Sequence, residues 1–182
     1  MAVAELSGRF HYIISGTRYF QGFAGLIQEK DALGTRLLSS LLILEYNKSM
    51  DAKLILLVDD DAAIRDVFSL KLGQEGYRVI IAENGLECVN LAKEKHPDLI
   101  LLDLKMPVMD GAQALAKLRE DPATRDIKVI FLTSYGDPSV PGIDEKFAKE
   151  AGAMGYMKKD VDMAVFSDTV RKALEQSSGP TG

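Results

Sequence analysis

Residues 99–111 read LILLDLKMPVMDG. The large aliphatic side chains at 99–102 indicate a strand that is covered on both faces of its sheet. Asp103 follows them directly and should therefore lie at the carboxyl end of that strand. Because ligands of open α/β sheets bind in the crevice outside such strand ends, Asp103 is a candidate site residue. For an aspartate taken alone, a role in a turn or a helix cap is the alternative.

The chain from residue 53 onward alternates strands and helices. Pro107 prevents regular structure from continuing past the opening stretch, and Asp110 can cap a helix that begins near Gly111. The expected strands cover residues 54–58, 77–82, 99–103, 128–132 and 153–157, and the expected helices lie near 64–72, 85–95, 112–120, 144–150 and 163–176. This alternation predicts an α/β fold with a doubly wound parallel sheet and right-handed crossovers.

The predicted sheet brings together polar residues that are far apart in the sequence. The carboxyl ends of parallel strands meet at one edge of a sheet, where a crevice can form. Asp59, Asp60, Asp103, Thr133 and Lys159 each follow an expected strand. We therefore expect all five side chains to lie in one crevice.

This set of side chains suits phosphoryl chemistry. Carboxylates that lie close together repel each other, which raises the pKa of at least one of them unless a cation neutralises them. Mg²⁺ prefers oxygen ligands and often binds through carboxylates and a phosphate oxygen, and the Lys159 ammonium and Thr133 hydroxyl complement a phosphoryl group. His11 and His96 lie far from the strand ends, so no Ser-His or Cys-His pair is available. The nucleophile that remains is a carboxylate.

Composition narrows the class of protein. The chain has 182 residues and a net charge of −5, with +1 on residues 1–50 and −6 on residues 51–182. It lacks a basic cluster, so we expect no direct binding to nucleic acid. A single cysteine, Cys88, excludes an internal disulfide and suits a reducing compartment, and we expect it to be a small core residue. No uncharged apolar run approaches the ~20 residues of a membrane span, and the first residues lack the basic-then-apolar pattern of a signal peptide. These two observations predict a cytoplasmic protein.

The first 50 residues carry less information. Residues 10–23 show neither helical nor strand periodicity, whereas residues 31–46 indicate a partly amphipathic helix. This segment is either an appended helix that packs on the domain or on a partner, or an artefact upstream of a natural start at Met50. The expected organisation is an N-terminal extension over 1–50, one domain over 51–176 and a disordered tail over 177–182.

Four motifs give the chain a specific resemblance. Residues 58–60 (VDD) resemble an acidic pair, 102–111 (LDLKMPVMDG) a phosphoacceptor loop, 131–134 (FLTS) a hydroxyl motif and 152–159 (GAMGYMKK) an aromatic-and-lysine motif. In this order they resemble the receiver domain of response regulators in two-component signalling. The resemblance covers residues 53–176 and implies the flavodoxin-like (βα)5 fold with strand order 2-1-3-4-5.

The resemblance also implies roles for the acidic residues. Asp103 would attack a phosphohistidine and become an acyl phosphate. Asp60, Asp103 and the backbone carbonyl of Lys105 would bind Mg²⁺ directly, and Asp59 would bind it through a water molecule. Apart from the resemblance, Asp59 and Asp60 could be a helix cap and a solvated acid, but Asp61 is better placed to provide the cap.

Three further residues receive roles in the same way. Thr133 would bind a phosphoryl oxygen, Tyr156 would swing inward as Thr133 moves, and Lys159 would pair with the phosphoryl charge. Lys159 is preferred over Lys158 because the family places its lysine three residues after the aromatic residue. The alternatives are a core residue for Tyr156, a solvated surface charge for Lys159 and an ordinary strand-end residue for Thr133.

The chain departs from the family in two places. Asp160 stands where the family usually has a cis-bonded proline, so this bond is either trans or cis at a cost of about 2.5–4 kcal/mol, which affects the reach of Lys159. Between Thr133 and Gly152 the chain is a few residues longer than usual and contains Pro138 and Pro141. This loop leads into the fourth helix of the family's usual output face.

We expect a signalling module rather than an enzyme. Only six residues follow Gln176, too few for an output domain. The expected partners are a sensor histidine kinase or histidine phosphotransfer protein and a downstream protein, and the chain would be a monomer or a phosphorylation-linked dimer. One alternative is a Mg²⁺-dependent phosphatase of the haloacid-dehalogenase type, which the Asp59-x-Asp61 spacing mimics, although such enzymes do not need Asp103. Another alternative is a scaffold that works without phosphate.

Overall fold

The computed structural model describes residues 2–6, 10–14, 52–134 and 145–176 of the chain. The chain divides into two compact units, Met1–Lys48 and Ser49–Gly182. In the first unit, β1 (Ala2–Leu6) pairs antiparallel with β2 (Phe10–Ile14). The sequence pattern did not predict this hairpin. The expected helix over 31–46, the loop with Pro138 and Pro141, and the tail over 177–182 lie outside the described residues.

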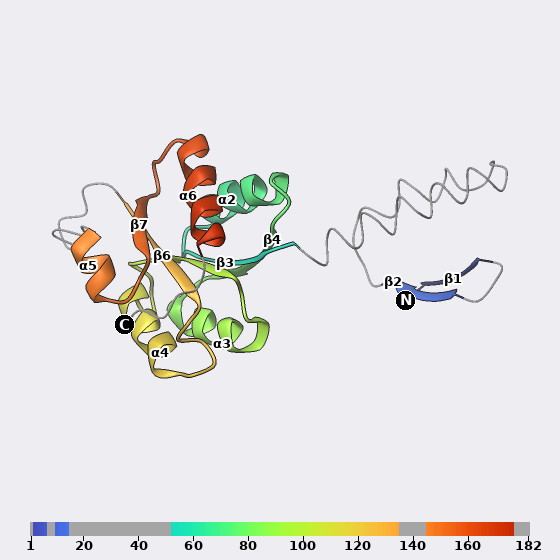
Figure 1. Cartoon of the computed structure of the whole chain (residues 1–182), viewed down its shortest axis with the longest axis horizontal. Helices are drawn as coiled ribbons and strands as arrows, with labels where there is room; N and C mark the ends of the chain where they lie inside the picture. Colours follow the sequence, from blue (N-terminus) through green and yellow to red (C-terminus); the bar gives the residue numbers. More distant parts are fainter. Residues whose placement is uncertain (1, 7–9, 15–51, 135–144, 177–182) are drawn as a thin grey trace. The chain divides into compact units, whose positions relative to one another are not determined.

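The second unit is a five-stranded parallel sheet with alternating helices (Figure 1). Its elements are β3 (Leu54–Val58), α2 (Ala62–Gln74), β4 (Arg78–Ala82), α3 (Gly85–Lys95), β5 (Leu99–Asp103), α4 (Gly111–Glu120), β6 (Lys128–Thr133), α5 (Glu145–Glu150), β7 (Gly155–Lys158) and α6 (Met163–Glu175). The strands lie in the order β4-β3-β5-β6-β7 and every neighbouring pair is parallel. This confirms the predicted α/β fold with strand order 2-1-3-4-5. The last strand begins at Gly155, two residues later than expected.

Each face of the sheet has its own hydrophobic core. On one face, α2 and α6 pack on alternate side chains of the strands, and Phe68 stacks on Phe166 with ring centroids 4.4 Å apart. On the other face, α3, α4 and α5 cover the remaining side chains, including the fully buried Cys88. Because both faces are covered, the central strands consist almost entirely of aliphatic residues, as the sequence pattern indicated.

Polar side chains define where the helices begin. Asp61, Asn84 and Asp110 cap α2, α3 and α4, and each accepts a hydrogen bond from a backbone N–H in the first turn. Left-handed backbone follows two of these helices, at Gly76 (φ 88°) and His96 (φ 47°). The predicted caps Asp61 and Asp110 are therefore confirmed. In α2, however, Val67 and Leu70 do not join Phe68 and Leu72 in the core, because they are 50% and 64% exposed.

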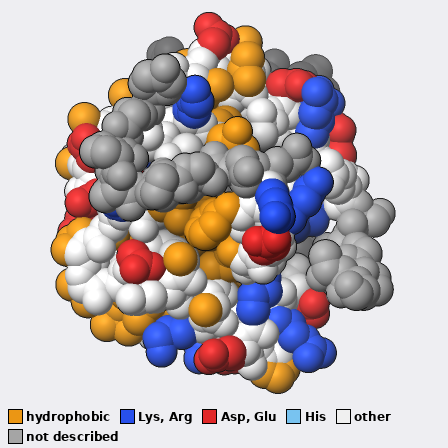
Figure 2. Space-filling view, turned by 90° about the vertical axis from the view of Figure 1, so that its left-hand side faces the viewer, with side chains coloured by type: hydrophobic (Ala, Val, Ile, Leu, Met, Phe, Trp, Pro, Cys, Tyr) orange, Lys and Arg blue, Asp and Glu red, His pale blue; other side chains and the backbone are white. Residues whose placement is uncertain are grey.

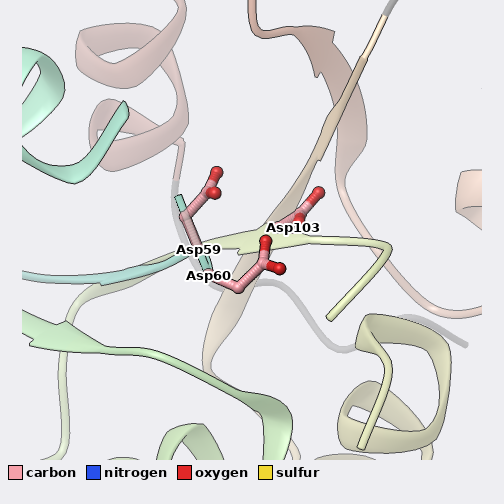
Figure 3. A group of neighbouring side chains, drawn as sticks. All are labelled: Asp59, Asp60 and Asp103. Carbon is pink, nitrogen blue, oxygen red and sulfur yellow. The ribbon is translucent and has the colours of Figure 1, made fainter. Parts of the chain in front are cut away.

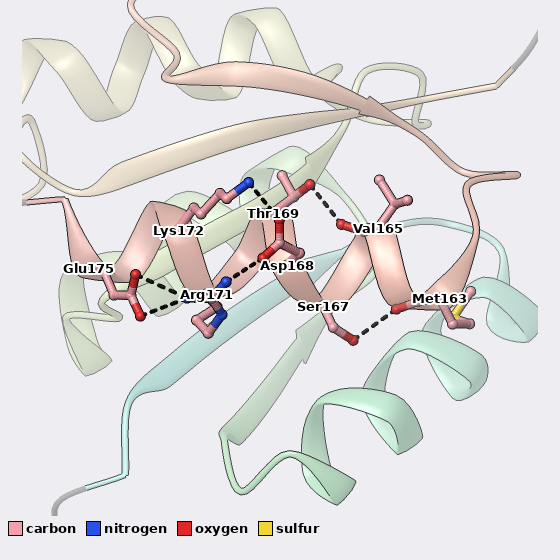
Figure 4. Close-up of polar contacts among 8 residues, drawn as sticks. All are labelled: Met163, Val165, Ser167, Asp168, Thr169, Arg171, Lys172 and Glu175. Atoms are coloured by element: carbon pink, nitrogen blue, oxygen red, sulfur yellow. Dashed lines mark hydrogen bonds and ion pairs between the residues drawn. The ribbon is translucent and has the colours of Figure 1, made fainter.

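Charged side chains lie on the exposed surface of the C-terminal half of α6 (Figure 4). Arg171 forms ion pairs with Asp168 and Glu175, and Lys172 pairs with Asp168 at 2.6 Å. The Thr169 hydroxyl donates to the carbonyl of Val165, one turn earlier. Exposed ion pairs at these spacings contribute little to stability, so this surface is solvated rather than strongly stabilising. Within the described parts of the chain, no helix combines the length and the apolar character needed to span a bilayer.

Candidate functional site

The structure brings three predicted acidic residues together at the carboxyl edge of the sheet. Asp59 and Asp60 follow β3, and Asp103 ends the neighbouring strand β5. One carboxylate oxygen from each residue lies within 4.8 Å of those of the other two (Figure 3). The juxtaposition follows from topology alone, because neighbouring parallel strands end side by side.

The three carboxylates differ in burial. Asp59 is fully buried, Asp103 is 3% exposed and Asp60 is exposed to solvent. One oxygen of Asp59, Oδ1, accepts a hydrogen bond from the backbone N–H of Asp61 at 3.0 Å. The other, Oδ2, is buried without a hydrogen bond of ordinary geometry. A buried carboxylate oxygen of this kind is stable only when a cation faces it.

Lys159 supplies that cation. Its Nζ lies 2.8 Å from Asp59 Oδ2 and 3.0 Å from Asp103 Oδ1, and its side chain is only 12% exposed. The Lys159 backbone N–H donates to the carbonyl of Thr133 at 2.8 Å, which ties the end of β7 to the end of β6. The described residues contain no cis peptide bond, so the bond to Asp160 is trans, and the ammonium still reaches both acids. Lys159 is thus a largely buried ion-pair partner rather than a solvated surface charge.

Burial and charge set the protonation of this pair. Burial raises the pKa of Asp103 to about 6, and the neighbouring Asp59 adds to this rise, whereas the Lys159 ammonium and the Lys105 backbone N–H oppose it. Burial works to lower the pKa of Lys159, but hydrogen bonds and charge from Asp59 and Asp103 outweigh it, and the pKa is raised. Lys159 therefore stays charged at neutral pH, while Asp103 gains a proton more readily than an ordinary aspartate.

The segment after Asp103 turns sharply back toward the sheet. The backbone N–H of Gly111 donates to the carbonyl of Leu104 at 3.0 Å, and a Cβ on Gly111 would lie 2.2 Å from the carbonyl oxygen of Asp103. Only glycine fits this close approach. Within the turn, Val108 has φ of 68° and is 80% exposed. A β-branched residue in this left-handed region is strained.

Thr133 and Tyr156 lie near the acids in the topology but are not engaged with them. The Thr133 hydroxyl donates weakly to the neighbouring Ser134 carbonyl at 3.4 Å. Tyr156 lies beside Phe131 in the pairing of β7 with β6 and is 37% exposed, so the alternative of a core tyrosine is wrong. Lys105 lies two residues after the end of β5 and is exposed.

Sequence reasoning missed one contact at this site. Arg65, on α2, donates from Nη1 to the backbone carbonyl of Asp59 at 2.8 Å and from Nη2 to Glu83 Oε1 at 2.9 Å. No local pattern could have indicated it, because Glu83 follows a different strand. Asp61, the second acid of the spacing that mimics the phosphatase alternative, caps α2 by accepting the Ala63 N–H at 2.8 Å.

The donor set fits Mg²⁺. All three clustered side chains offer carboxylate oxygens, the ligands that this ion prefers, and the exposed Asp60 leaves a path from solvent. The buried Asp59 Oδ2, which lacks a well-formed hydrogen bond, adds an oxygen suited to a cation or its bound water. Asp59, Asp60 and Asp103 could therefore hold the ion.

Comparison with known proteins decides the family. The family model described as response regulator receiver domain matches residues 55–171. The chain belongs to this family. It is 36% identical over 124 residues to sporulation initiation phosphotransferase F of Bacillus subtilis, which covers 68% of this chain and 95% of that protein. It is 38% identical over 125 residues to the DNA-binding dual master transcriptional regulator RpaA of Synechocystis, but spans only about half (49%) of that protein's length.

Solved receiver structures agree with this membership. The receiver domain of sensor histidine kinase PA1611 from Pseudomonas aeruginosa, determined with magnesium in its active-site cleft, has a TM-score of 0.61 and 28% identity, covering 69% of this chain and 99% of that one. A CheY-like receiver domain protein from Methanospirillum hungatei has a TM-score of 0.60 and 31% identity, covering 69% and 95%. The resemblance carried by the sequence motifs is thereby confirmed.

Proposed function

We propose that this receiver domain accepts a phosphoryl group on Asp103 from a sensor histidine kinase or a histidine phosphotransfer protein. The observation that carries the proposal is the placement of Asp103 at the end of β5, 3.0 Å from the Lys159 ammonium and clustered with two further acids. Among the described residues only Asp59 shares both features, and its two oxygens already accept the Asp61 N–H and face Lys159.

The reaction needs little from the protein beyond position and charge. An Asp103 carboxylate oxygen attacks the phosphorus atom, the phosphorus–nitrogen bond to the donor histidine breaks, and the imidazole leaves with the bonding pair and takes up a proton. The Lys159 ammonium, already beside Asp103, pairs with the phosphoryl charge as it arrives. The Thr133 hydroxyl, weakly held in the free protein, can turn to donate to a phosphoryl oxygen.

The residues that would hold Mg²⁺ are Asp60, Asp103 and the Lys105 carbonyl, with Asp59 acting through water. When bound, the ion neutralises charge on the carboxylates and on the phosphoryl oxygens. Asp59 keeps Lys159 in place by its own ion pair, so the ammonium remains at the site whichever oxygens of Asp103 are occupied.

We infer that the response reaches the face formed by α5, β7 and α6. Thr133 and Tyr156 lie on adjacent strands, so a movement of Thr133 toward the phosphoryl group would make room for Tyr156 to turn inward. Figure 2 looks onto the side of the unit where α5 and β7 lie, with hydrophobic side chains near its centre and Lys and Arg mainly toward its right and lower edges. The exposed Phe147 and Tyr156 belong to these two elements. A downstream protein would read this face.

The remaining expectations belong to the same proposal. The domain would act in the cytoplasm as a monomer or a phosphorylation-linked dimer, without binding nucleic acid directly or a membrane. Its chemistry would be limited to gaining and losing its own phosphoryl group, without turnover of other substrates. The capping role of Asp61 argues against the phosphatase alternative.

Phosphorylation with a small donor tests the proposal. The full chain is incubated with acetyl phosphate and Mg²⁺, and the intact mass is measured for wild type and Asp103→Ala. Wild type should gain one phosphoryl group and Asp103→Ala none, with Asp61→Asn as the control that keeps the adduct. An adduct that persists in Asp103→Ala, or sustained hydrolysis of a generic phosphate ester by wild type, would overturn the proposal.

A further inference from the structure

We propose that Arg65 is a positioning residue that holds the backbone between Asp59 and Asp60 and thereby sets the affinity of the acidic cluster for Mg²⁺. This inference rests on the proposed function, because it concerns the ion that the cluster would bind. Arg65 lies on α2, outside the acidic cluster, and would help to set the geometry of that cluster.

Arg65 joins two strand ends. Its guanidinium donates to the Asp59 carbonyl at 2.8 Å and to the Glu83 carboxylate at 2.9 Å, while the Asp59 N–H donates to the Ala82 carbonyl at 3.2 Å. The Arg65 side chain is 13% exposed, far less than the 63% of Glu83. A planar guanidinium with two fixed donors suits such a bridge, because both contacts form in one orientation of the group.

The peptide held by Arg65 is the one that carries Asp60. Asp59 has further constraints, since Oδ1 accepts from Asp61 N–H and Oδ2 faces Lys159. The Asp60 side chain, by contrast, is exposed, and none of the hydrogen bonds and ion pairs found among the described residues involves it. The direction of the Asp60 side chain therefore depends on its backbone. Arg65 holds the carbonyl of the Asp59–Asp60 peptide, and so fixes the orientation of that backbone.

Charge and position predict opposite effects of removing Arg65. A guanidinium next to an acidic cluster repels Mg²⁺, although Glu83 offsets part of that charge. If charge alone mattered, Arg65→Gln would tighten Mg²⁺ binding. If position matters more, as we propose, the same change weakens binding, because Asp60 is no longer held in place. The sign of the change separates the two explanations.

The chain offers a matched control in Arg119. Its guanidinium also donates to backbone carbonyls, those of Gly152 at 2.9 and 3.1 Å and of Arg125 at 2.8 Å. These carbonyls precede β7 and β6, so they lie at the opposite edge of the sheet from the acids. Arg119→Gln removes a comparable set of hydrogen bonds without touching the cluster.

The experiment is a MgCl₂ titration of the ¹⁵N-labelled full chain, followed by amide chemical shifts, for wild type, Arg65→Gln, Arg65→Lys and Arg119→Gln. We expect both Arg65 variants to raise the Mg²⁺ dissociation constant about tenfold, as loss of an outer-shell partner typically does. Arg65→Lys keeps the positive charge but loses the planar guanidinium with its two fixed donors. If Arg65→Gln does not fold, the test is made with Arg65→Lys. Arg119→Gln should stay within about twofold of wild type.

Each outcome has a defined meaning. An unchanged or tighter dissociation constant in the folded Arg65 variants, with wild-type binding intact, overturns the role of Arg65 and leaves the proposed function standing. An equal weakening in Arg119→Gln also overturns it, because the effect would then reflect general stability. If wild type shows no saturable shifts at the acidic cluster, the inference and the Mg²⁺ part of the proposed function fail together.

Discussion

At the carboxyl edge of the sheet three carboxylates cluster beside one ammonium, which pairs with only two of them, whereas at the amino edge Asp98 and Lys128 each have partners of their own. Asp98, before β5, pairs with Lys53 at 2.8 Å and accepts the Leu54 N–H at 2.8 Å. Lys128 donates to backbone carbonyls at the end of α6. The amino edge therefore stabilises the fold, while the carboxyl edge keeps an excess of negative charge that a divalent ion or a phosphoryl reaction can use.

The largest effect should come from removing the only cation that the described structure places between Asp59 and Asp103. Lys159→Met leaves both buried acids without an ion-pair partner, which should lower the free energy of unfolding by about 3 kcal/mol at neutral pH without Mg²⁺. Urea denaturation, followed by circular dichroism, measures this free energy of unfolding. Lys158→Met, on the exposed neighbour, is the control and should change little. If Lys159→Met and wild type were equally stable, the view that Lys159 compensates the buried acids at the carboxyl edge would be wrong.

Replacing Asp103 should have the opposite effect and raise the free energy of unfolding. Burial raises the pKa of Asp103 to about 6, so the folded state binds the proton more tightly than the unfolded state, and stability falls as pH rises from about 4 to about 6. Asp103→Asn removes this cost and should raise the free energy of unfolding by up to about 2 kcal/mol at pH 7 without Mg²⁺.

Denaturation of Asp103→Asn at several pH values tests this sign. The gain should be complete above pH 6 and absent near pH 4, where the wild-type carboxyl is already protonated. Asp61→Asn is the control, since asparagine caps a helix as well as aspartate does. A variant less stable than wild type at pH 7 would show that the Lys159 ion pair with Asp103 outweighs the cost of burying this acid.

A smaller loss is expected at the amino edge. Burial works to raise the pKa of Asp98, but Lys53 and the Leu54 N–H outweigh it and lower the pKa. Its stabilisation is therefore present at neutral pH and is lost as pH falls through the folded-state pKa. Asp98→Ala should cost about 1–2 kcal/mol, because it removes a charge-assisted bond to the backbone.

Lys53→Ala is the matched control for Asp98→Ala. It removes only the exposed ion pair and should cost less than about 0.5 kcal/mol. Thermal unfolding at pH 7 and pH 3 compares the two variants. Two results would contradict a stabilising role for ionised Asp98 at the amino edge. The two variants could lose the same free energy of unfolding, or the loss in Asp98→Ala could be larger at pH 3 than at pH 7.

Much of this arrangement could be predicted from the sequence. The aliphatic run before Asp103 specifies a central strand, and the topology then requires Asp59 and Asp103 to meet, whatever the side chains do. Caps such as Asp61 and Asn84 were predictable because their hydrogen bonds are local. The reach of Lys159 followed from its position at a strand end, even with Asp160 after it.

Other features depend on tertiary contacts that local periodicity does not encode. Arg65 contacts Glu83 across two strands, and nothing in either segment indicates the other. Val67 and Leu70 have the apolar character of a core face, but the rotation of α2 on the sheet turns them to solvent. Side-chain chemistry fixes the period of an element more readily than its exact orientation.

The smallest effect concerns Val108, in the turn beside the acidic cluster. Its left-handed backbone costs about 1–2 kcal/mol for a residue with a Cβ, whereas its side chain, 80% exposed, gains little from packing. Glycine removes the strain but adds freedom to the unfolded chain, worth about 0.5–1 kcal/mol. Val108→Gly should therefore raise the free energy of unfolding by roughly 0.5 kcal/mol, whereas Val108→Ala, which keeps the Cβ, should not. If both variants lower stability equally, the Val108 side chain packs in the turn. The clustered charges would then be the only destabilising feature described at the carboxyl edge.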